Sequence, residues 1–258
     1  MPIDFAPHER GAPFSGDFAA ALDAVQGRIA SLSTAQVVHH KRTLVVLEGW
    51  VGAGKTAALS RLVAALDPCH TKVLAMRDVT ERDDERHWFA PFWEALPAGG
   101  ETTIFFRSWY SRAATARRAG ALGDRGWHRA IDEINEFENQ QREHGTALVK
   151  LFFHVSPEVQ AERIRERAED PWARHLFTAE QVARIGARAE MGPIAAELLD
   201  ATDTRWAPWT MIDAADPRSA QTAALGAVAA AMAKSIPADP PADVHSAEVV
   251  DLDSRRRG

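Results

Sequence analysis

A run of eight residues in the first quarter of the chain has the composition and spacing of a phosphate-binding loop. Residues 49–56 are GWVGAGKT, which matches GxxxxGK[ST] at every fixed position. Glycines allow successive backbone N–H groups to turn toward an anion, and the helix N-terminus that follows adds partial positive charge. Lys55 would span the outer phosphates and the Thr56 hydroxyl would reach a magnesium ion. We therefore expect a phosphate site that contains Gly49, Gly52, Gly54, Lys55 and Thr56.

The segments on both sides of this run are those that the motif requires. Residues 43–47 are apolar without polar alternation, which is typical of a strand buried on both faces of a parallel sheet. Residues 59–66 then place apolar side chains on one helical face, and this helix ends near Pro68. Because a strand before the motif and a helix after it remove most chance matches, the pattern favours a true phosphate loop.

Strands and helices continue to alternate along the chain. This alternation predicts an α/β fold with a doubly wound parallel sheet and short right-handed crossovers. Further strands are expected at 72–76, 102–106, 147–155 and 209–213, and further helices at 17–33, 82–96, 127–144, from Pro157 onward, 178–199 and 220–234.

The ends of the chain and its overall charge narrow the possible functions. Residues 1–16 are predicted to be a flexible N-terminus, 17–236 a single domain and 237–258 a disordered tail rich in Pro and charge. The net charge of −6 argues against a general nucleic-acid binder, and the single Cys69 excludes an internal disulfide. No secretory signal or apolar run of membrane-spanning length is recognisable, so we expect a cytoplasmic protein without a membrane partner.

Several ordered motifs resemble one family. Residues 88–100 (WFAPFWEALPAGG) precede the strand 102–106, which leads into RSWYSRA at 107–113. There follow EFE at 136–138, KLFF at 150–153, Gln160, Arg163, Arg167, DP at 170–171, APW at 207–209 and DAAD at 213–216. Together, over about residues 20–235, they are similar to the polyphosphate kinase 2 family. The resemblance implies a three-layer, thymidylate-kinase-like P-loop core with a helical lid over about 160–200. It also implies transfer of phosphate between inorganic polyphosphate and a nucleoside mono- or diphosphate, with Mg²⁺.

Basic residues in these motifs suit a phosphate chain. Arg107 and Arg112 follow the end of an expected strand, where open parallel sheets place their ligands. Arg163 and Arg167 share a helix face, and guanidinium groups form paired hydrogen bonds with phosphate. We predict Lys55, Arg107 and Arg112 to be catalytic, with Arg163 and Arg167 also binding phosphate. For all four arginines, and most of all for the two helical ones, a solvated surface is the alternative. The aromatic residues Trp88, Phe92, Trp93 and Trp109 could stack a base or pack in the core.

Two positions depart from the family pattern. The resemblance implies a carboxylate two residues after the first glycine of the loop and another just before RSWY, but the chain has Val51 and Phe106 there. Magnesium prefers hard oxygen ligands, and valine and phenylalanine offer none. The magnesium site is therefore unknown from the sequence, and Thr56 is one possible ligand. Three acids near strand ends could compensate: Glu48, Asp78 and Glu81.

Three functions remain open from the sequence. The first is a polyphosphate-dependent nucleotide kinase, of weak activity if the carboxylate losses matter. The second is a catalytically silent paralogue that binds polyphosphate or nucleotide, or supports a partner subunit. The third is a kinase with ATP as donor, because GAGKT is a common form of nucleotide-binding loop. The expected partners are polyphosphate and nucleoside phosphates but no nucleic acid, and the expected assembly is a homo-oligomer.

Overall fold

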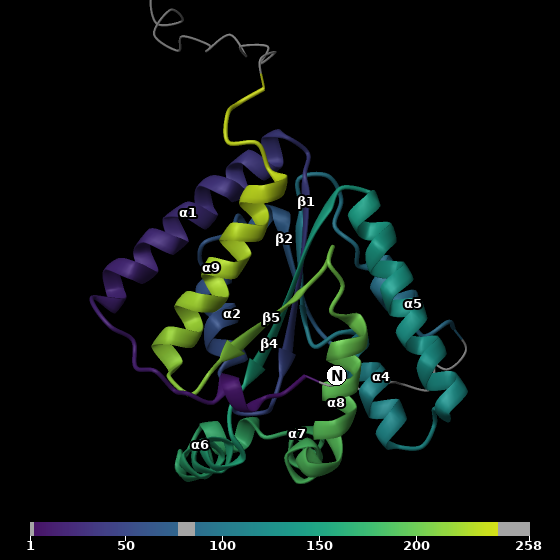
Figure 1. Ribbon diagram of the computed structural model, residues 1–258. Helices are drawn as coiled ribbons and strands as arrows, with labels where there is room; N and C mark the ends of the chain where they lie inside the picture. Colours follow the sequence, from purple (N-terminus) through teal and green to yellow (C-terminus); the bar gives the residue numbers. More distant parts are fainter. Residues whose placement is uncertain (1–2, 77–85, 242–258) are drawn as a thin grey trace, which may run out of the picture.

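The computed structural model describes residues 3–76 and 86–241, which form an α/β fold around one parallel sheet (Figure 1). The strand order is β2-β3-β1-β4-β5, so β1 lies at the centre with β3 and β4 beside it. The chain therefore leaves β1 at the point where the winding direction reverses, which is where open α/β sheets bind ligands. The strands are β1 (Arg42–Gly49), β2 (Thr71–Ala75), β3 (Thr102–Phe106), β4 (Thr146–His154) and β5 (Trp209–Asp213).

The predicted doubly wound sheet is confirmed, and every expected strand is present. In β1, Leu47 is paired with Phe106 of β3 and with Leu151 of β4, so the carboxyl ends of these strands lie level with one another. The apolar run of β1 is almost completely buried because helices cover both faces of the sheet.

Helices form a layer on each face of the sheet (Figure 1). One layer contains α1 (Phe18–Val38), α2 (Lys55–Val63) and α9 (Pro217–Ser235). The other contains α3 (Ala90–Glu94), α4 (Trp109–Arg118), α5 (Asp124–Glu143) and α8 (Arg188–Thr202). The remaining two, α6 (Pro157–Glu169) and α7 (Ala179–Gly186), lie beyond the carboxyl ends of the strands. No helix within the described ranges combines the length and hydropathy that crossing a membrane requires.

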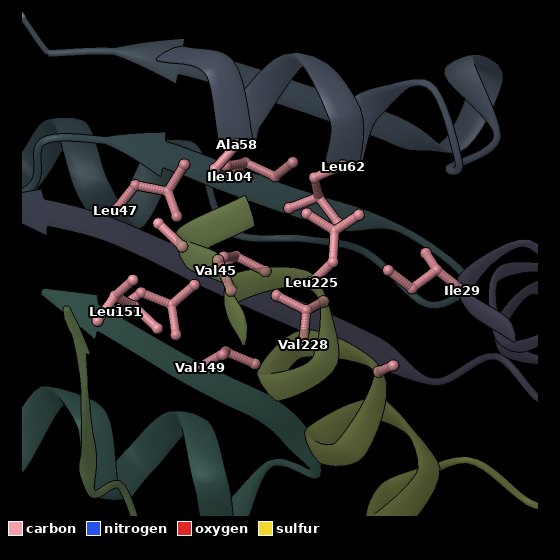
Figure 2. Close-up of a cluster of buried hydrophobic side chains, with 14 of the residues drawn as sticks. Ile29, Val45, Leu47, Ala58, Leu62, Ile104, Val149, Leu151, Leu225 and Val228 are labelled. Carbon is pink, nitrogen blue, oxygen red and sulfur yellow. The ribbon is translucent and has the colours of Figure 1, made fainter. Parts of the chain in front are cut away.

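Each layer buries its own apolar core against the sheet. Figure 2 shows the α1, α2 and α9 side, where Val45, Leu47 and Ile104 of the sheet meet Leu62 and Leu225 of the helices. On the opposite face the core is aromatic, and Phe92 and Trp109 are fully buried in it. These two rings therefore pack in the core, which was one of the two alternatives left open by the sequence.

Three helical segments differ from the prediction. For the helix expected over 82–96, residues 82–85 lie outside the described part and helix α3 begins only at Ala90. The helix expected over 178–199 is two helices, because α7 ends after Gly186 and α8 begins at Arg188. Glycine is a weak helix former, which favours this break. Helix α4 was not predicted; it begins where the Ser108 hydroxyl caps the amide of Tyr110.

Residues 3–16 contact the domain, although they were expected to be loose. Phe5 stacks on His154 with a 4.6 Å separation of ring centroids, and the amide of Gly11 donates to Asp213 over 2.9 Å. These contacts place the N-terminal segment against the carboxyl ends of β4 and β5. For the predicted tail, residues 237–241 are described and the rest lies outside the described ranges.

Candidate phosphate-transfer site

The motif of residues 49–56 forms a loop between β1 and α2. Gly49 and Gly54 have φ of +126° and +85°, in the left-handed region that glycine tolerates. A Cβ atom on Gly49 would lie 2.2 Å from the carbonyl oxygen of Phe153, so only glycine fits between β1 and β4. Helix α2 begins at Lys55, and its free N-terminal amides therefore face the space enclosed by the loop.

Lys55 is buried at the first position of α2, and its ammonium lies against the loop. Nζ donates to the carbonyl oxygens of Gly49 and Trp50, each over 2.7 Å. Burial is the main cause that lowers the pKa of Lys55 to about 7; the negative charge of Glu48 opposes this shift, and the positive charges of Arg184 and Arg107 add to it. A polyanion in the cavity would reverse this effect, because it favours the charged form of the lysine.

A cavity of about 470 Å³ opens in front of the loop, and its charged lining is basic. The loop and α2 form one wall, the ends of β2 and β3 a second, and helices α6 and α7 a third. Of the predicted site residues, the cavity brings together Gly49, Gly52, Gly54, Lys55, Thr56, Arg107, Arg163 and Arg167.

Arg107 connects β3 to α4 through an unusual backbone conformation. Its φ of +64° lies in the left-handed region, which is rare for a residue with a side chain. Its Nε donates to the carbonyl oxygen of Met76 at the end of β2 over 3.1 Å. The guanidinium group is thereby held at the mouth of the cavity, at the carboxyl ends of two neighbouring strands.

The two predicted arginines of α6 also lie in the cavity wall. Arg163 donates to the carbonyl oxygens of Gly52 and Ala215 over 3.3 and 2.8 Å, which connects α6 to the phosphate loop. The guanidinium group of Arg167 lies 4.6 Å from the ring centroid of Phe177. These two arginines therefore contact the protein and do not lie on a merely solvated helix face, and their phosphate-binding role stays a prediction.

Arg112, the third residue predicted to be catalytic, does not line the basic cavity. Its side chain lines a separate cavity of about 400 Å³ between α4 and α5, together with Trp88, Arg129 and Glu133. Arg112 follows Ser111 on α4, and successive residues of a helix point in different directions. Ser111 lines a pocket beside the phosphate loop, whereas Arg112 points away from that pocket. The structure thus separates Arg112 from Lys55 and Arg107, with which it was grouped.

Sequence reasoning missed Arg184 and gave Gln160 no role. Arg184 of α7 lines both the basic cavity and the neighbouring pocket. Gln160 is buried, donates to the carbonyl oxygen of Val51 over 2.7 Å and accepts from Arg188 over 2.6 Å. Spacing alone gave no signal for Arg184, because its position depends on the break between α7 and α8.

An apolar pocket adjoins the basic cavity and shares Gly49, Val51 and Arg184 with it. Its far walls come from β4, β5, α4 and α8. The larger apolar residues of these walls are Tyr110, Phe152, Met191, Leu198, Leu199 and Trp209, and Trp50 of the phosphate loop lies opposite them in the lining. The two spaces meet at the loop, and the apolar pocket is the smaller of them, with a volume of about 70 Å³.

Comparison with known proteins identifies the family. The family model of polyphosphate kinase 2 matches residues 15–239, which is most of the chain. The chain belongs to the polyphosphate kinase 2 family. Among its relatives, a polyphosphate:AMP phosphotransferase of Pseudomonas syringae pv. tomato is 32% identical over 86% of this chain and 45% of the relative. A GDP-polyphosphate phosphotransferase of Mycolicibacterium smegmatis is 31% identical over 72% of this chain and 66% of the relative.

Solved structures of polyphosphate kinase 2 proteins share the fold. One from Pseudomonas aeruginosa PA01, assigned as polyphosphate kinase 2, superposes with a TM-score of 0.82 at 31% identity, covering 87% of this chain and 49% of the other. Polyphosphate kinase 2 from Arthrobacter aurescens TC1 superposes with a TM-score of 0.83 at 24% identity and supports the fold alone. The chain spans less than half the length of the two Pseudomonas polyphosphate:AMP phosphotransferases that it matches.

The magnesium expected for a polyphosphate kinase 2 finds no suitable ligand set among the described residues. Val51 and Phe106 both line the basic cavity, where their side chains offer no oxygen. Thr56 supplies a single hydroxyl, and no three of His, Cys, Asp and Glu in the described ranges come together as a metal cluster. Asp78 and Glu81 lie outside the described residues. The described donors therefore do not fit the ion.

Glu48, the third acid considered as a replacement ligand, is used structurally. Its Oε1 accepts from the amide and hydroxyl of Ser108 over 2.7 and 2.9 Å, and its Oε2 accepts from the Ser111 hydroxyl over 2.7 Å. The carboxylate thus binds the first turn of α4, where the helix dipole favours negative charge. This contact fixes the segment that carries Arg107.

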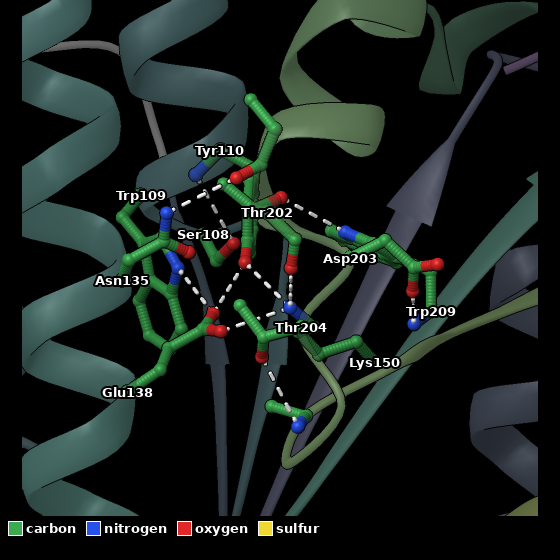
Figure 3. A network of polar contacts seen from close by, with 12 residues as sticks. Ser108, Trp109, Tyr110, Asn135, Glu138, Lys150, Thr202, Asp203, Thr204 and Trp209 are labelled. Carbon is green, nitrogen blue, oxygen red and sulfur yellow. Dashed lines mark hydrogen bonds and ion pairs between the residues drawn. The ribbon is translucent and has the colours of Figure 1, made fainter. Parts of the chain in front are cut away.

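A buried ionic network holds the other side of α4 in place (Figure 3). Nζ of Lys150 donates to Glu138 over 2.9 Å, to the Tyr110 hydroxyl over 3.1 Å and to the carbonyl oxygen of Thr202 over 2.7 Å. Trp109 and Tyr110 also donate to Glu138. Burial raises the pKa of Glu138, and Lys150 opposes that rise. The network connects α4, α5, β4 and α8, and so positions the polyphosphate kinase 2 motif that follows β3.

Proposed function

We propose that this chain transfers phosphate between inorganic polyphosphate and a nucleoside mono- or diphosphate. The observation that carries the proposal is the pair of adjoining spaces, one basic and one apolar, that meet at the phosphate loop. Two relatives are named as a polyphosphate:AMP phosphotransferase and a GDP-polyphosphate phosphotransferase, and these names support the same reaction.

The basic cavity suits the phosphate chain. Negative charge spreads over the oxygens of a phosphoryl group as it transfers, so catalysis depends on positioning and on neutralising that charge. Lys55 at the helix N-terminus and Arg107 at the strand end are placed for this, and Arg163 and Arg167 hold the chain from α6. Arg184 faces both spaces, where it can contact the group that moves between them.

The apolar pocket is the candidate site for the nucleoside of the acceptor, and because its volume is about 70 Å³, it must widen to admit a nucleobase. Aromatic walls stack on a nucleobase without selecting one base strongly, while polar edge contacts select among bases.

The cytoplasmic location and the homo-oligomeric state expected from the sequence stay predictions, as does a role for Mg²⁺.

The test is a transfer assay with purified chain, long-chain polyphosphate and a panel of nucleoside mono- and diphosphates, with and without added magnesium. We expect a new phosphoanhydride on at least one acceptor, with loss of at least tenfold in rate for Lys55→Ala. Binding without transfer would favour the silent paralogue. Transfer from ATP but not from polyphosphate would favour the ATP-dependent kinase.

A further inference from the structure

Trp50, the second residue of the phosphate loop, is held separately by its backbone and by its side chain. Its amide donates to the carbonyl oxygen of Phe153 over 3.2 Å, and its own carbonyl accepts from Nζ of Lys55 over 2.7 Å. Among the described residues that line the two spaces, Trp50 belongs to the apolar pocket alone. Its backbone is therefore part of the phosphate loop, whereas its side chain is part of the candidate nucleoside site.

Contacts from three other parts of the chain hold the indole. Its Nε1 donates to Nδ1 of His154, at the end of β4, over 2.8 Å. The guanidinium carbon of Arg188, at the start of α8, lies 4.7 Å from the ring centroid. Phe5 packs edge-on against the same ring, with a 6.1 Å separation of centroids. The N-terminal segment thus reaches a side chain of the phosphate loop.

The hydrogen bond from Trp50 fixes the protonation of His154. An indole N–H can only donate, so Nδ1 of His154 accepts and carries no proton. Nε2 carries the proton of the neutral ring and donates to Oε1 of Glu9 over 2.7 Å. The histidine side chain is 2% exposed, and its burial lowers its pKa, while the hydrogen bond to Glu9 opposes that shift. Trp50, His154 and Glu9 therefore form one hydrogen-bonded chain from the phosphate loop to the N-terminal segment.

We infer that Glu9 and His154 are positioning residues, which hold the indole of Trp50 as a wall of the nucleoside site. The inference rests on the proposed function, because it concerns the acceptor of that reaction. Glu9 precedes residues 15–239, which the family model matches, so membership of the family assigns it no role. An indole released from this chain of hydrogen bonds has to be ordered again when a nucleobase enters, and that ordering weakens acceptor binding.

The first experiment compares His154→Leu with His154→Asn in the full chain. The two side chains have nearly the same shape, but only asparagine offers an oxygen to the indole N–H. With the best acceptor of the transfer assay, we expect an acceptor KM about fivefold higher in the Leu variant than in the Asn variant. We expect kcat and the calorimetric affinity for polyphosphate to be alike in both, because the backbone of Trp50 keeps its own contacts. An equal acceptor KM in the two variants would overturn the inference.

The second experiment concerns Glu9, whose side chain is 32% exposed and can be changed without disturbing the core. Glu9→Ala removes the acceptor of the histidine Nε2–H, and we expect it to raise the acceptor KM severalfold. Glu9→Gln keeps an oxygen there and should restore the wild-type KM. Arg10→Ala, at the next and exposed position, is the control and should leave the KM unchanged. A wild-type KM in Glu9→Ala would overturn the inference.

A third measurement needs no phosphate transfer. In isotope-labelled full chain, the indole N–H resonance of Trp50 is the one that Trp50→Phe removes. We expect His154→Leu to move this resonance to the position of an unbonded indole, and Glu9→Gln to leave it in place. A resonance that His154→Leu does not move would overturn the inference. A wild-type chain that transfers phosphate to no acceptor would overturn the proposed function, and the resonance would still decide whether His154 holds the indole.

Discussion

The amide of Arg107 donates to the carbonyl oxygen of Leu47 over 3.0 Å, which extends the hydrogen bonding between β1 and β3 one residue beyond the end of β3. Arg107 itself has a φ of +64°, and α4 begins two residues later. Backbone hydrogen bonding and a left-handed turn together place the guanidinium group at the cavity. Strain of this kind costs about 1–3 kcal/mol and is commonly retained where a site needs the geometry.

The first prediction separates the backbone strain at Arg107 from the effect of its guanidinium charge. Arg107→Gly and Arg107→Ala both remove the guanidinium group, but only glycine relieves the left-handed backbone. We expect the Gly variant to be about 1 kcal/mol more stable than the Ala variant, and both to lose polyphosphate affinity alike. Urea unfolding and calorimetric titration measure the two effects. Equal unfolding free energies would show that the turn is not strained in solution.

The second prediction concerns pH. The pKa of buried Lys55 is lowered to about 7, so the lysine loses its proton in the free protein as pH rises above that value. Bound phosphate raises this pKa, so complex formation takes up a proton. We expect the affinity for polyphosphate to be highest below pH 7 and to fall as pH rises from 7 toward 9. Lys55→Arg, which keeps its charge, should flatten the profile, and an equally steep fall in that variant would assign the titration to another group.

The same lysine affects stability in the opposite direction. Because its folded pKa is below the unfolded value of 10.5, the unfolded chain holds the extra proton between about pH 7 and 10.5. Over that range this group makes folding more favourable as pH rises. Ligand affinity and protein stability should therefore show opposite pH slopes from Lys55, which gives the measurement an internal check.

The fold was more predictable from sequence than the site. Strands buried on both faces leave uninterrupted apolar runs, and β1 and β3 were located by such runs. The phosphate loop was predictable because its glycines and Lys55 are adjacent in sequence. Arg184 joins the site only through the folding of α7, which spacing does not encode. That Arg112 lines a different cavity was not predictable for a related reason, since its direction depends on helix α4, whose alanine- and arginine-rich sequence shows little apolar periodicity.

The third prediction tests the support of the phosphate loop by α6. Gln160 donates to the carbonyl of Val51 and accepts from Arg188, so Gln160→Met leaves two polar groups without this partner. We expect a loss of about 1–3 kcal/mol in unfolding free energy and a several-fold loss in polyphosphate affinity, without a change in net charge. Ala168→Met, at an exposed position of the same helix, is the control and should change neither. If both variants bind alike, the loop holds its shape without Gln160.

The last prediction concerns the buried pair of Lys150 and Glu138, whose side chains have no solvent exposure and lie 2.9 Å apart. Lys150→Met leaves the Glu138 carboxylate buried without its cation, which typically costs about 3–5 kcal/mol. Burial raises the pKa of Glu138, and loss of the lysine raises it further. A carboxyl whose folded pKa is above its unfolded value stabilises the fold at low pH and loses that effect as pH rises through the folded pKa. The deficit in unfolding free energy of the Lys150→Met variant should therefore shrink as pH is lowered from 7 toward 5.

The double variant Lys150→Met with Glu138→Leu removes both charges and should recover much of the lost unfolding free energy at pH 7, as measured by urea unfolding. A single variant whose deficit does not change with pH, or a double variant no more stable than the single one, would mean that the pair does not hold α4 in place through its charge.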